Sequence, residues 1–196
     1  MDAQIAWARQ RNLKIFVTFA SIPSWANGVP QSCNFWENPE CAKPPTSTSF
    51  YTEFVGKVVR RYRNEVKHWG VWNEPNLKTF WSADVNAYIK LILEPGYWAI
   101  KLADPEAQVV GPDLAHADPN FLQYLRRDTD FAWYNWLRDI LRYGPTPLID
   151  ILSHHAYLRR AGDVGRALDW VRDIAVRNRG AHLPVWLTET AFNSCN

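Results

Sequence analysis

Residues 66–76 read VKHWGVWNEPN and join a short apolar run to a polar turn that contains a proline. The β-branched and aromatic side chains of residues 66–72 favour a β-strand, whereas Pro75 cannot continue one. Glu74 therefore follows the carboxyl end of the expected strand. Because parallel α/β folds bind ligands at the carboxyl ends of their strands, we expect the Glu74 carboxyl to face the ligand-binding side of such a sheet.

Strand-like runs alternate with helical patterns along the rest of the chain. Four further apolar, β-branched runs predict strands at residues 13–19, 108–111, 149–153 and 185–188. Between them, apolar side chains recur every three or four residues, which predicts helices over residues 5–11, 51–66, 85–101, 131–141 and 164–174. Pro95 requires the third of these helices to kink or break. This alternation, with long crossovers, indicates an α/β fold with a parallel sheet.

The spacing of the expected strands leaves two architectures open. One is an open, doubly wound sheet, and the other is an eight-stranded barrel of roughly 250 residues or more. The length of 196 residues alone favours the open sheet, because five strand-and-helix units cannot close an eight-stranded ring. The barrel alternative requires residues 1–196 to form one partial barrel domain of a longer protein.

The composition is that of an ordinary soluble globular unit, with 47% hydrophobic residues, 21% charged residues and a net charge of +2. The sequence has no basic stripe that would bind nucleic acid and no apolar run near the roughly 18 residues that span a membrane. The first residues show no signal-peptide pattern. The 11 tryptophans are unusual, and they either fill a large core or stack against sugar rings.

A second carboxylate follows a strand in the same way as Glu74. Glu189 lies in the sequence LTET, residues 187–190, at the end of the last expected strand. Two carboxyl groups at matching strand ends suit glycoside hydrolysis, in which one protonates the leaving oxygen and the other attacks the anomeric carbon or activates a water. An isolated glutamate at a strand end is usually a solvated rim residue, but Asn73 and Pro75 beside Glu74 favour the catalytic alternative.

The sequence WNEPN resembles the acid/base motif that follows the fourth strand in the clan A glycoside hydrolases, which include family 5 cellulases and family 39 β-xylosidases. LTET resembles their nucleophile segment after the seventh strand. The resemblance implies a (β/α)8 TIM barrel and hydrolysis of β-glycosidic bonds with retention, through a covalent glycosyl-enzyme intermediate. It also implies that Glu74 is the acid/base, that Glu189 is the nucleophile and that Asn73 holds the sugar 2-hydroxyl.

Two further segments carry the resemblance. His155-Ala156-Tyr157 resembles the clan's His-x-Tyr motif, which implies that Tyr157 orients the nucleophile and that His155 lines the sugar subsite. Residues 22–26 are similar to the loop after the third strand. Matched in this way, the chain holds the third to seventh strands, and strands one, two and eight are absent. We therefore expect an incomplete barrel and a partial catalytic domain, from a parent protein that is extracellular or secreted.

Other polar and aromatic residues give weaker signals. Asp113 and His116 follow a strand, where they either touch sugar hydroxyls or form turn and cap hydrogen bonds. His154 and His155 point to opposite sides of a strand and lack a third ligand at zinc spacing, so we expect no metal and no cofactor. The candidate sugar platforms are the loop aromatics Trp25, Phe35, Trp36, Phe80 and Trp81.

The spacing of Cys33 and Cys41, eight residues apart in a loop, leaves a disulfide and two free thiols equally open.

The leading hypothesis is a retaining β-glycosidase or endoglycanase that acts on a β-linked polysaccharide or oligosaccharide. It places the carboxyls of Glu74 and Glu189 about 5 to 5.5 Å apart. One alternative is a non-catalytic, carbohydrate-binding or structural fragment, and another is an open-sheet domain that binds an anionic small molecule. In a partial barrel, the unpaired edges at residues 13–19 and 185–188 predict association into a homo-oligomer.

Overall fold

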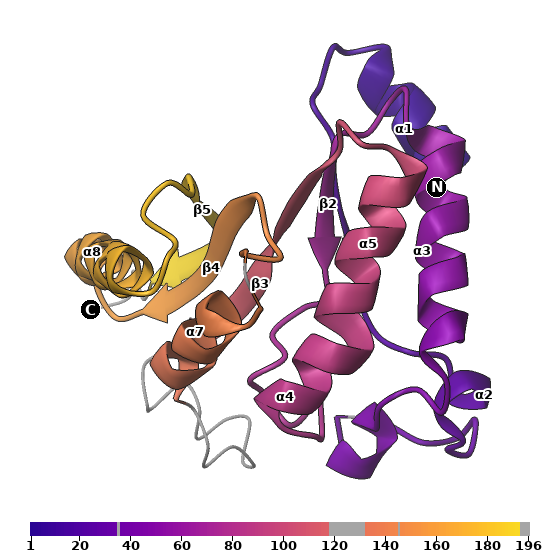
Figure 1. Ribbon diagram of the computed structural model, residues 1–196, viewed down its shortest axis with the longest axis horizontal. Coiled ribbons are helices and arrows are strands. Elements are labelled where there is room, and N and C mark those ends of the chain that lie inside the picture. Colours follow the sequence, from indigo (N-terminus) through magenta and orange to yellow (C-terminus); the bar gives the residue numbers. More distant parts are fainter. Residues whose placement is uncertain (35, 118–131, 145, 193–196) are drawn as a thin grey trace.

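The computed structural model describes residues 1–34, 36–117, 132–144 and 146–192, and five strands alternate with helices along the chain (Figure 1). The elements are α1 (Asp2–Arg9), β1 (Phe16–Phe19), α2 (Ser24–Asn27), the 3-10 helix η1 (Pro39–Ala42), α3 (Thr48–Tyr62), β2 (His68–Val71), α4 (Val85–Tyr88), the π-helix η2 (Ile89–Leu93), α5 (Glu94–Ala103), β3 (Gln108–Ala117), α7 (Trp133–Arg142), β4 (Ile151–Leu158), α8 (Ala161–Arg177) and β5 (Val185–Phe192).

The five strands form one parallel sheet in the order β1-β2-β3-β4-β5, which confirms the predicted α/β class. A doubly wound sheet reverses its strand order at a switch point, whereas this sheet adds each strand on the same side. The open-sheet architecture is therefore wrong, and the sheet is a partial (β/α)8 barrel whose edges are β1 and β5.

The sheet curls strongly enough to bring its two edge strands together on the inner side. The ring of Trp186 on β5 meets Phe16 of β1 edge-on at 6.3 Å and lies 5.0 Å from the ring of His68 on β2. In a flat sheet these strands would be separated by the full width of three others. Side chains from both edges therefore fill one end of the barrel interior.

The helices cover the outer face of the sheet. In Figure 1, α3 and α5 lie side by side next to β2, whereas α7 and α8 flank β3 and β4. The side chain of Ser47 caps the start of α3 by accepting a hydrogen bond from the Ser49 amide. The apolar face of this helix buries Val55 and Val59, whereas Phe54 of the same helix is 58% exposed.

The helix predicted to kink or break at Pro95 continues through it. The residues just before it form the π-helix η2, and α5 begins at Glu94 with Pro95 in its first turn. A proline lacks an amide hydrogen, and the wider π turn accommodates this without ending the helix. Gly96 packs against Tyr51 and Val71, which an added Cβ would approach to 3.0 Å, so a glycine allows α5 to lie close to α3 and β2.

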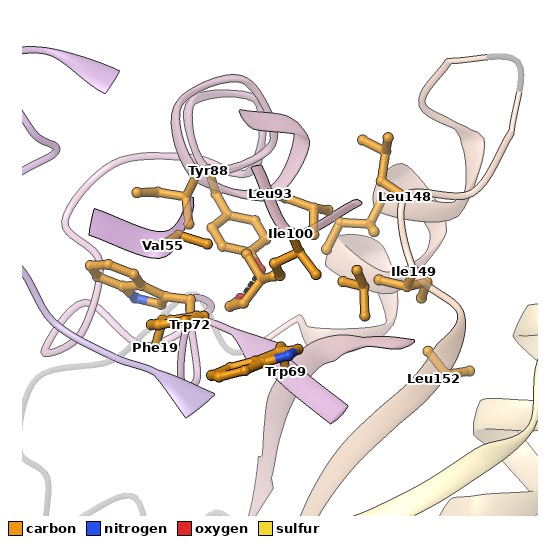
Figure 2. Packing of buried hydrophobic residues seen from close by; sticks show 14 of the residues in the cluster. Phe19, Val55, Trp69, Trp72, Tyr88, Leu93, Ile100, Leu148, Ile149 and Leu152 are labelled. Carbon is orange, nitrogen blue, oxygen red and sulfur yellow. Dashed lines mark hydrogen bonds between the residues drawn. The ribbon is translucent and has the colours of Figure 1, made fainter. Parts of the chain in front are cut away.

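A large aromatic and aliphatic core lies between these helices and the sheet (Figure 2). Phe19 and Trp69 stack with ring centroids 5.3 Å apart, and the Tyr88 hydroxyl donates a hydrogen bond to the Val71 carbonyl at 2.8 Å. Ile100 of α5 is fully buried against the same group. This core fixes β2, and with it the loop that carries Glu74.

The long loop between β1 and α3 is closed by a disulfide between Cys33 and Cys41, which settles the open question of these two thiols. The Asn27 amide group also donates to the carbonyls of Cys41 and Lys43, at 3.0 and 3.3 Å. These bonds tie the loop together, and the Ser82 amide, in the segment after β2, donates to its Ala42 carbonyl at 3.0 Å. Among the described helices, none has the length and apolar character needed to cross a bilayer.

Candidate active site

The loop after β2 positions Glu74 by bonding to the neighbouring strand β3. The Glu74 amide donates to the Asp113 carbonyl at 3.1 Å. The Asn76 side chain pairs with the backbone of Ala115 in both directions, donating to its carbonyl and accepting from its amide, each at 2.9 Å. Trp72 and Glu74 adopt positive φ angles of 81° and 45°, a strained conformation that side chains rarely adopt outside functional sites.

Glu189 reaches the same place from β5. The parallel register places it opposite His155 of β4, after an irregularity between His154 and His155. The Tyr157 hydroxyl donates a 2.6 Å hydrogen bond to Glu189 Oε2. Because β5 is an edge strand, the Glu189 side chain is 45% exposed, whereas the Glu74 side chain is 11% exposed.

His155 lies between the two glutamates. Its Nδ1 is 2.9 Å from Glu74 Oε1 and 3.5 Å from Glu189 Oε2, and its Nε2 is 3.5 Å from Asp113 Oδ1. Burial alone would lower the pKa of His155, but the hydrogen bonds with Asp113 and Glu74 outweigh it and raise the pKa to about 9. The imidazole is therefore cationic at neutral pH.

The two carboxyls are close enough for direct attack on a sugar. One oxygen of each glutamate and a ring nitrogen of His155 all lie within 4.8 Å of one another. Retaining glycosidases place their carboxyls about 5 to 5.5 Å apart, whereas inverting enzymes need about 6.5 to 9.5 Å to admit a water. The oxygen pair within 4.8 Å is closer than the separation that admits a water, and the sequence predicted carboxyls about 5 to 5.5 Å apart.

The same three residues are also the metal-ligand cluster that the described part of the chain contains. With His155 protonated, the cluster as it stands offers two of the three ligands. A protonated imidazole has no lone pair for a cation, and Glu74 and Glu189 already contact His155 and Tyr157.

Three strands are longer than the sequence predicted, so several site residues lie within strands rather than in the loops after them. β3 was expected to end at Gly111 but continues to Ala117, and β4 and β5 likewise extend through His155 and Glu189. His116, His155 and Glu189 pair in register with neighbouring strands, and Asp113 lies at a register shift within β3, so the sheet itself positions them.

His116 is a correction to the expected sugar contacts. Its Nδ1 pairs with His154 Nε2 at 3.3 Å, and its ring stacks on Trp133 of α7 at 4.7 Å. Burial lowers the pKa of both histidines, that of His154 to about 3. His154 and His116 therefore form a neutral pair on the helix side of the sheet, while His155 faces the glutamates, as predicted for neighbouring strand residues.

Trp81 is a second correction. It is fully buried in the core, and its indole nitrogen donates to the Asp84 carbonyl at 3.1 Å, so no sugar can stack on it. Trp25 is 69% exposed and meets Phe50 edge-on beside a cavity of about 370 Å³. Phe35 lies outside the described residues.

Asn73, the residue before Glu74, lines a cavity of about 230 Å³. Its walls include Trp72 and Phe80 on one side, and Cys41 of the disulfide-closed loop on the other. Phe80 in turn meets Trp36 edge-on at 5.6 Å. The cavity therefore combines an amide with aromatic surface.

For Asp113, the sequence left contact with a sugar and local hydrogen bonding open, and the structure shows hydrogen bonds to β4 and β5. It is 1% exposed, so it does not reach a sugar hydroxyl. Its Oδ1 accepts a 2.7 Å hydrogen bond from the Thr188 hydroxyl, and its amide donates to Ser153 Oγ at 3.1 Å. Asp113 thus bonds to β4 and to the residue that precedes Glu189.

Comparison with known proteins agrees with this geometry. The family described as glycosyl hydrolases family 39 matches residues 1–183. A β-xylosidase from Geobacillus stearothermophilus is 28% identical over 94% of this chain, and one from Caldicellulosiruptor saccharolyticus is 30% identical over 80%. The chain spans 39% and 30% of the lengths of these two proteins.

Solved structures show the same fold. A monomeric β-xylosidase from Caulobacter crescentus CB15 has a TM-score of 0.71 and 22% identity, covering 97% of this chain and 40% of its own. A GH39 β-xylosidase from Caulobacter crescentus has a TM-score of 0.58 and 26% identity, covering 79% of this chain and 32% of its own.

Proposed function

This chain belongs to glycosyl hydrolases family 39, and from that membership we propose that the protein is a retaining β-glycosidase with Glu74 as acid/base and Glu189 as nucleophile. The observation that carries the proposal is the convergence of the two carboxyls on His155, with one oxygen of each within 4.8 Å of the other. This spacing supports attack by a carboxylate rather than by an intervening water.

In the first step, a Glu189 oxygen attacks the anomeric carbon while the bond to the leaving oxygen breaks. Glu74 gives its proton to that oxygen, so the aglycone leaves as a neutral alcohol. The hydrogen bond from Tyr157 holds Glu189 Oε2 in one orientation, which leaves its other oxygen for attack. The product of this step is a glycosyl ester on Glu189.

In the second step, the Glu74 carboxylate accepts a proton from a water that attacks the anomeric carbon from the side of the departed aglycone. The ester bond breaks, and Glu189 is released as a carboxylate. Two displacements at one carbon restore the β configuration. Asn73 is the residue that we assign to the sugar 2-hydroxyl, since it directly precedes Glu74 and lines a cavity.

We propose a β-xyloside as the preferred substrate, because both of the curated relatives above are named β-xylosidases. The broader expectation from the sequence was a β-linked polysaccharide or oligosaccharide. The test compares release of the aryl group from aryl β-xyloside, aryl β-glucoside and a soluble glucan, with Glu189→Ala as the inactive control. We expect the fastest turnover on the xyloside. Absence of turnover on all three substrates would contradict the enzymatic function.

A second candidate is a module that binds carbohydrate without cleaving it. The 45% exposure of the Glu189 side chain on an unpaired edge strand favours this candidate. Calorimetric binding of xylo-oligosaccharide to the unmodified chain, without product in the same sample, would support it over hydrolysis.

We propose that the two unpaired edges associate, giving a homo-oligomer. β1 and β5 each leave one side of their backbone without a strand partner within the described sheet. Sedimentation velocity should show species larger than the 22.7 kDa chain, increasing with concentration.

The Cys33–Cys41 disulfide supports an oxidising compartment, such as the extracellular space, as the site of action.

A further inference from the structure

Asp113 is a buried carboxylate at the back of the site. Its side chain is 2% exposed, and its Oδ1 lies 3.5 Å from His155 Nε2 while accepting a hydrogen bond from Thr188. Its other oxygen, Oδ2, is buried and has no hydrogen-bond partner among the described residues. A carboxylate buried in this way needs a compensating positive charge nearby.

His155 is the group that faces it. Carboxylates lie at both ends of the imidazole, with Glu74 and Glu189 at Nδ1 and Asp113 at Nε2. Within the described part of the chain, the other titratable neighbours, Tyr157 and His154, are uncharged at neutral pH. Tyr157 keeps its proton, since burial and its hydrogen bond to Glu189 raise its pKa, and burial lowers the pKa of His154.

We propose that Asp113 is a positioning residue that keeps a proton on both ring nitrogens of His155, so that the proton exchanged with substrate resides on Glu74. The proposal rests on the catalytic roles given above for Glu74 and Glu189.

A neutral His155 would interfere with the acid step. With its proton on Nε2, the ring would present an Nδ1 lone pair to Glu74 at 2.9 Å, and the Glu74 proton would bond to that lone pair rather than to the leaving oxygen. The negative charge of Asp113 next to Nε2 favours the doubly protonated ring. Nδ1–H then donates to Glu74 and stabilises the carboxylate that forms once the proton has left.

Asp113 also contacts the segments that carry the two glutamates. Its carbonyl accepts the Glu74 amide hydrogen bond at 3.1 Å, and its Oδ1 holds Thr188, the residue before Glu189. One residue of β3 therefore contacts the acid/base loop, the imidazole and the nucleophile strand.

The test is the titration of His155 by histidine ¹⁵N NMR on the full chain, with the signal assigned from its loss in His155→Gln. We compare wild type, Asp113→Asn, Glu74→Gln and Asp104→Asn. Asp104 is also buried, but its carboxylate pairs with Lys67 at 2.7 Å and serves as the matched control.

We expect the His155 midpoint to fall by at least about one pH unit in Asp113→Asn, to fall by less in Glu74→Gln, and to stay unchanged in Asp104→Asn. An unchanged midpoint in Asp113→Asn would overturn the proposal. If Asp113→Asn does not fold, Glu74→Gln decides, because a fall to the ordinary histidine value of about 6.5 would assign the proton to Glu74 instead of Asp113.

The titration does not require turnover, so it separates this proposal from the proposed function. A His155 midpoint that falls in Asp113→Asn, in a chain without hydrolytic activity, would reject the enzymatic function and still show that Asp113 holds the second proton on His155. Hydrolysis by a chain whose His155 midpoint does not change in Asp113→Asn would support the enzymatic function and reject the role of Asp113.

Discussion

The hydroxyl of Tyr157 donates a 2.6 Å hydrogen bond to Glu189 Oε2 across the β4–β5 pair. The bond joins an inward side chain of β4 to the proposed nucleophile on the edge strand. It is one of the contacts that keep Glu189 in place although 45% of its side chain is exposed.

Tyr157→Phe removes this bond and leaves the ring. A hydrogen bond to a charged group contributes about 1.5 to 3 kcal/mol, so kcat/KM for aryl β-xyloside should fall about 10- to 100-fold. Tyr143→Phe is the matched control, because that tyrosine donates a similar 2.8 Å bond to Glu94 away from the site. Equal losses in the two variants would contradict the orienting role.

Replacement of Glu74 and replacement of Glu189 should have different effects on turnover. Glu189→Ala should abolish turnover of every substrate, because no nucleophile remains. Glu74→Ala should retain much of the first step on aryl glycosides with good leaving groups, which need little protonation, and azide should restore turnover. Steady-state kinetics over a leaving-group series measures this. An equal loss on all substrates would rule out the acid role of Glu74.

Asn76 should prove important for both stability and activity. In Asn76→Ala, the amide and carbonyl of Ala115 lose their buried partner, so the free energy of unfolding in urea should fall by about 2 to 3 kcal/mol. The acid/base loop should loosen, and kcat should fall with it. Asn86→Ala, at an exposed position of α4, should change stability by less than about 0.5 kcal/mol. A similar, small effect at Asn76 would mean that the loop is held by other contacts.

Stability should depend on pH through His155 with a definite sign. Its folded pKa of about 9 exceeds the ordinary value of about 6.5, so the folded chain binds more protons between these two pH values. The stabilisation is complete below about pH 6.5 and is lost as the pH rises towards 9. The difference in unfolding free energy between wild type and His155→Gln should therefore shrink by up to about 3 kcal/mol over this range.

His154 provides the contrast, because its folded pKa of about 3 is lowered by burial. Its effect belongs to the acid range, where the unfolded chain takes up the proton first and stability falls as the pH drops from about 6.5 towards 3. A His154→Gln variant should change only this acid range.

A constant difference between wild type and His155→Gln from pH 6 to 9 would show that His155 is not held in its charged form.

The strands and most helices could be predicted because their apolar spacing is a local property of the sequence. The full length of β3 could not, since the polar residues Asp113 and His116 suggest a loop when read alone. His116 pairs with β4 in register, and Asp113, at the irregularity before it, bonds to Ser153 of β4 through its amide, although β4 lies some forty residues later in the chain. The register also shifts between Gly111 and Leu114, so side-chain direction cannot be counted from the strand start.

The two glutamates were found from their matching places after strands, whereas the groups that hold them were not. Asp113 acts through His155 and Thr188, and Asn76 acts through Ala115, all distant in sequence. Trp81 was misplaced for a similar reason, because a loop tryptophan beside polar residues gives no local sign of whether its ring enters the core.

The most direct test of the account is the configuration of the sugar when it is first released from an aryl β-xyloside, followed by ¹H NMR before mutarotation. Two displacements through Glu189 predict that β-xylose appears first and that the α anomer grows in later. Initial release of α-xylose would mean a single displacement by water, which would contradict the pairing of Glu74 and Glu189 as acid/base and nucleophile.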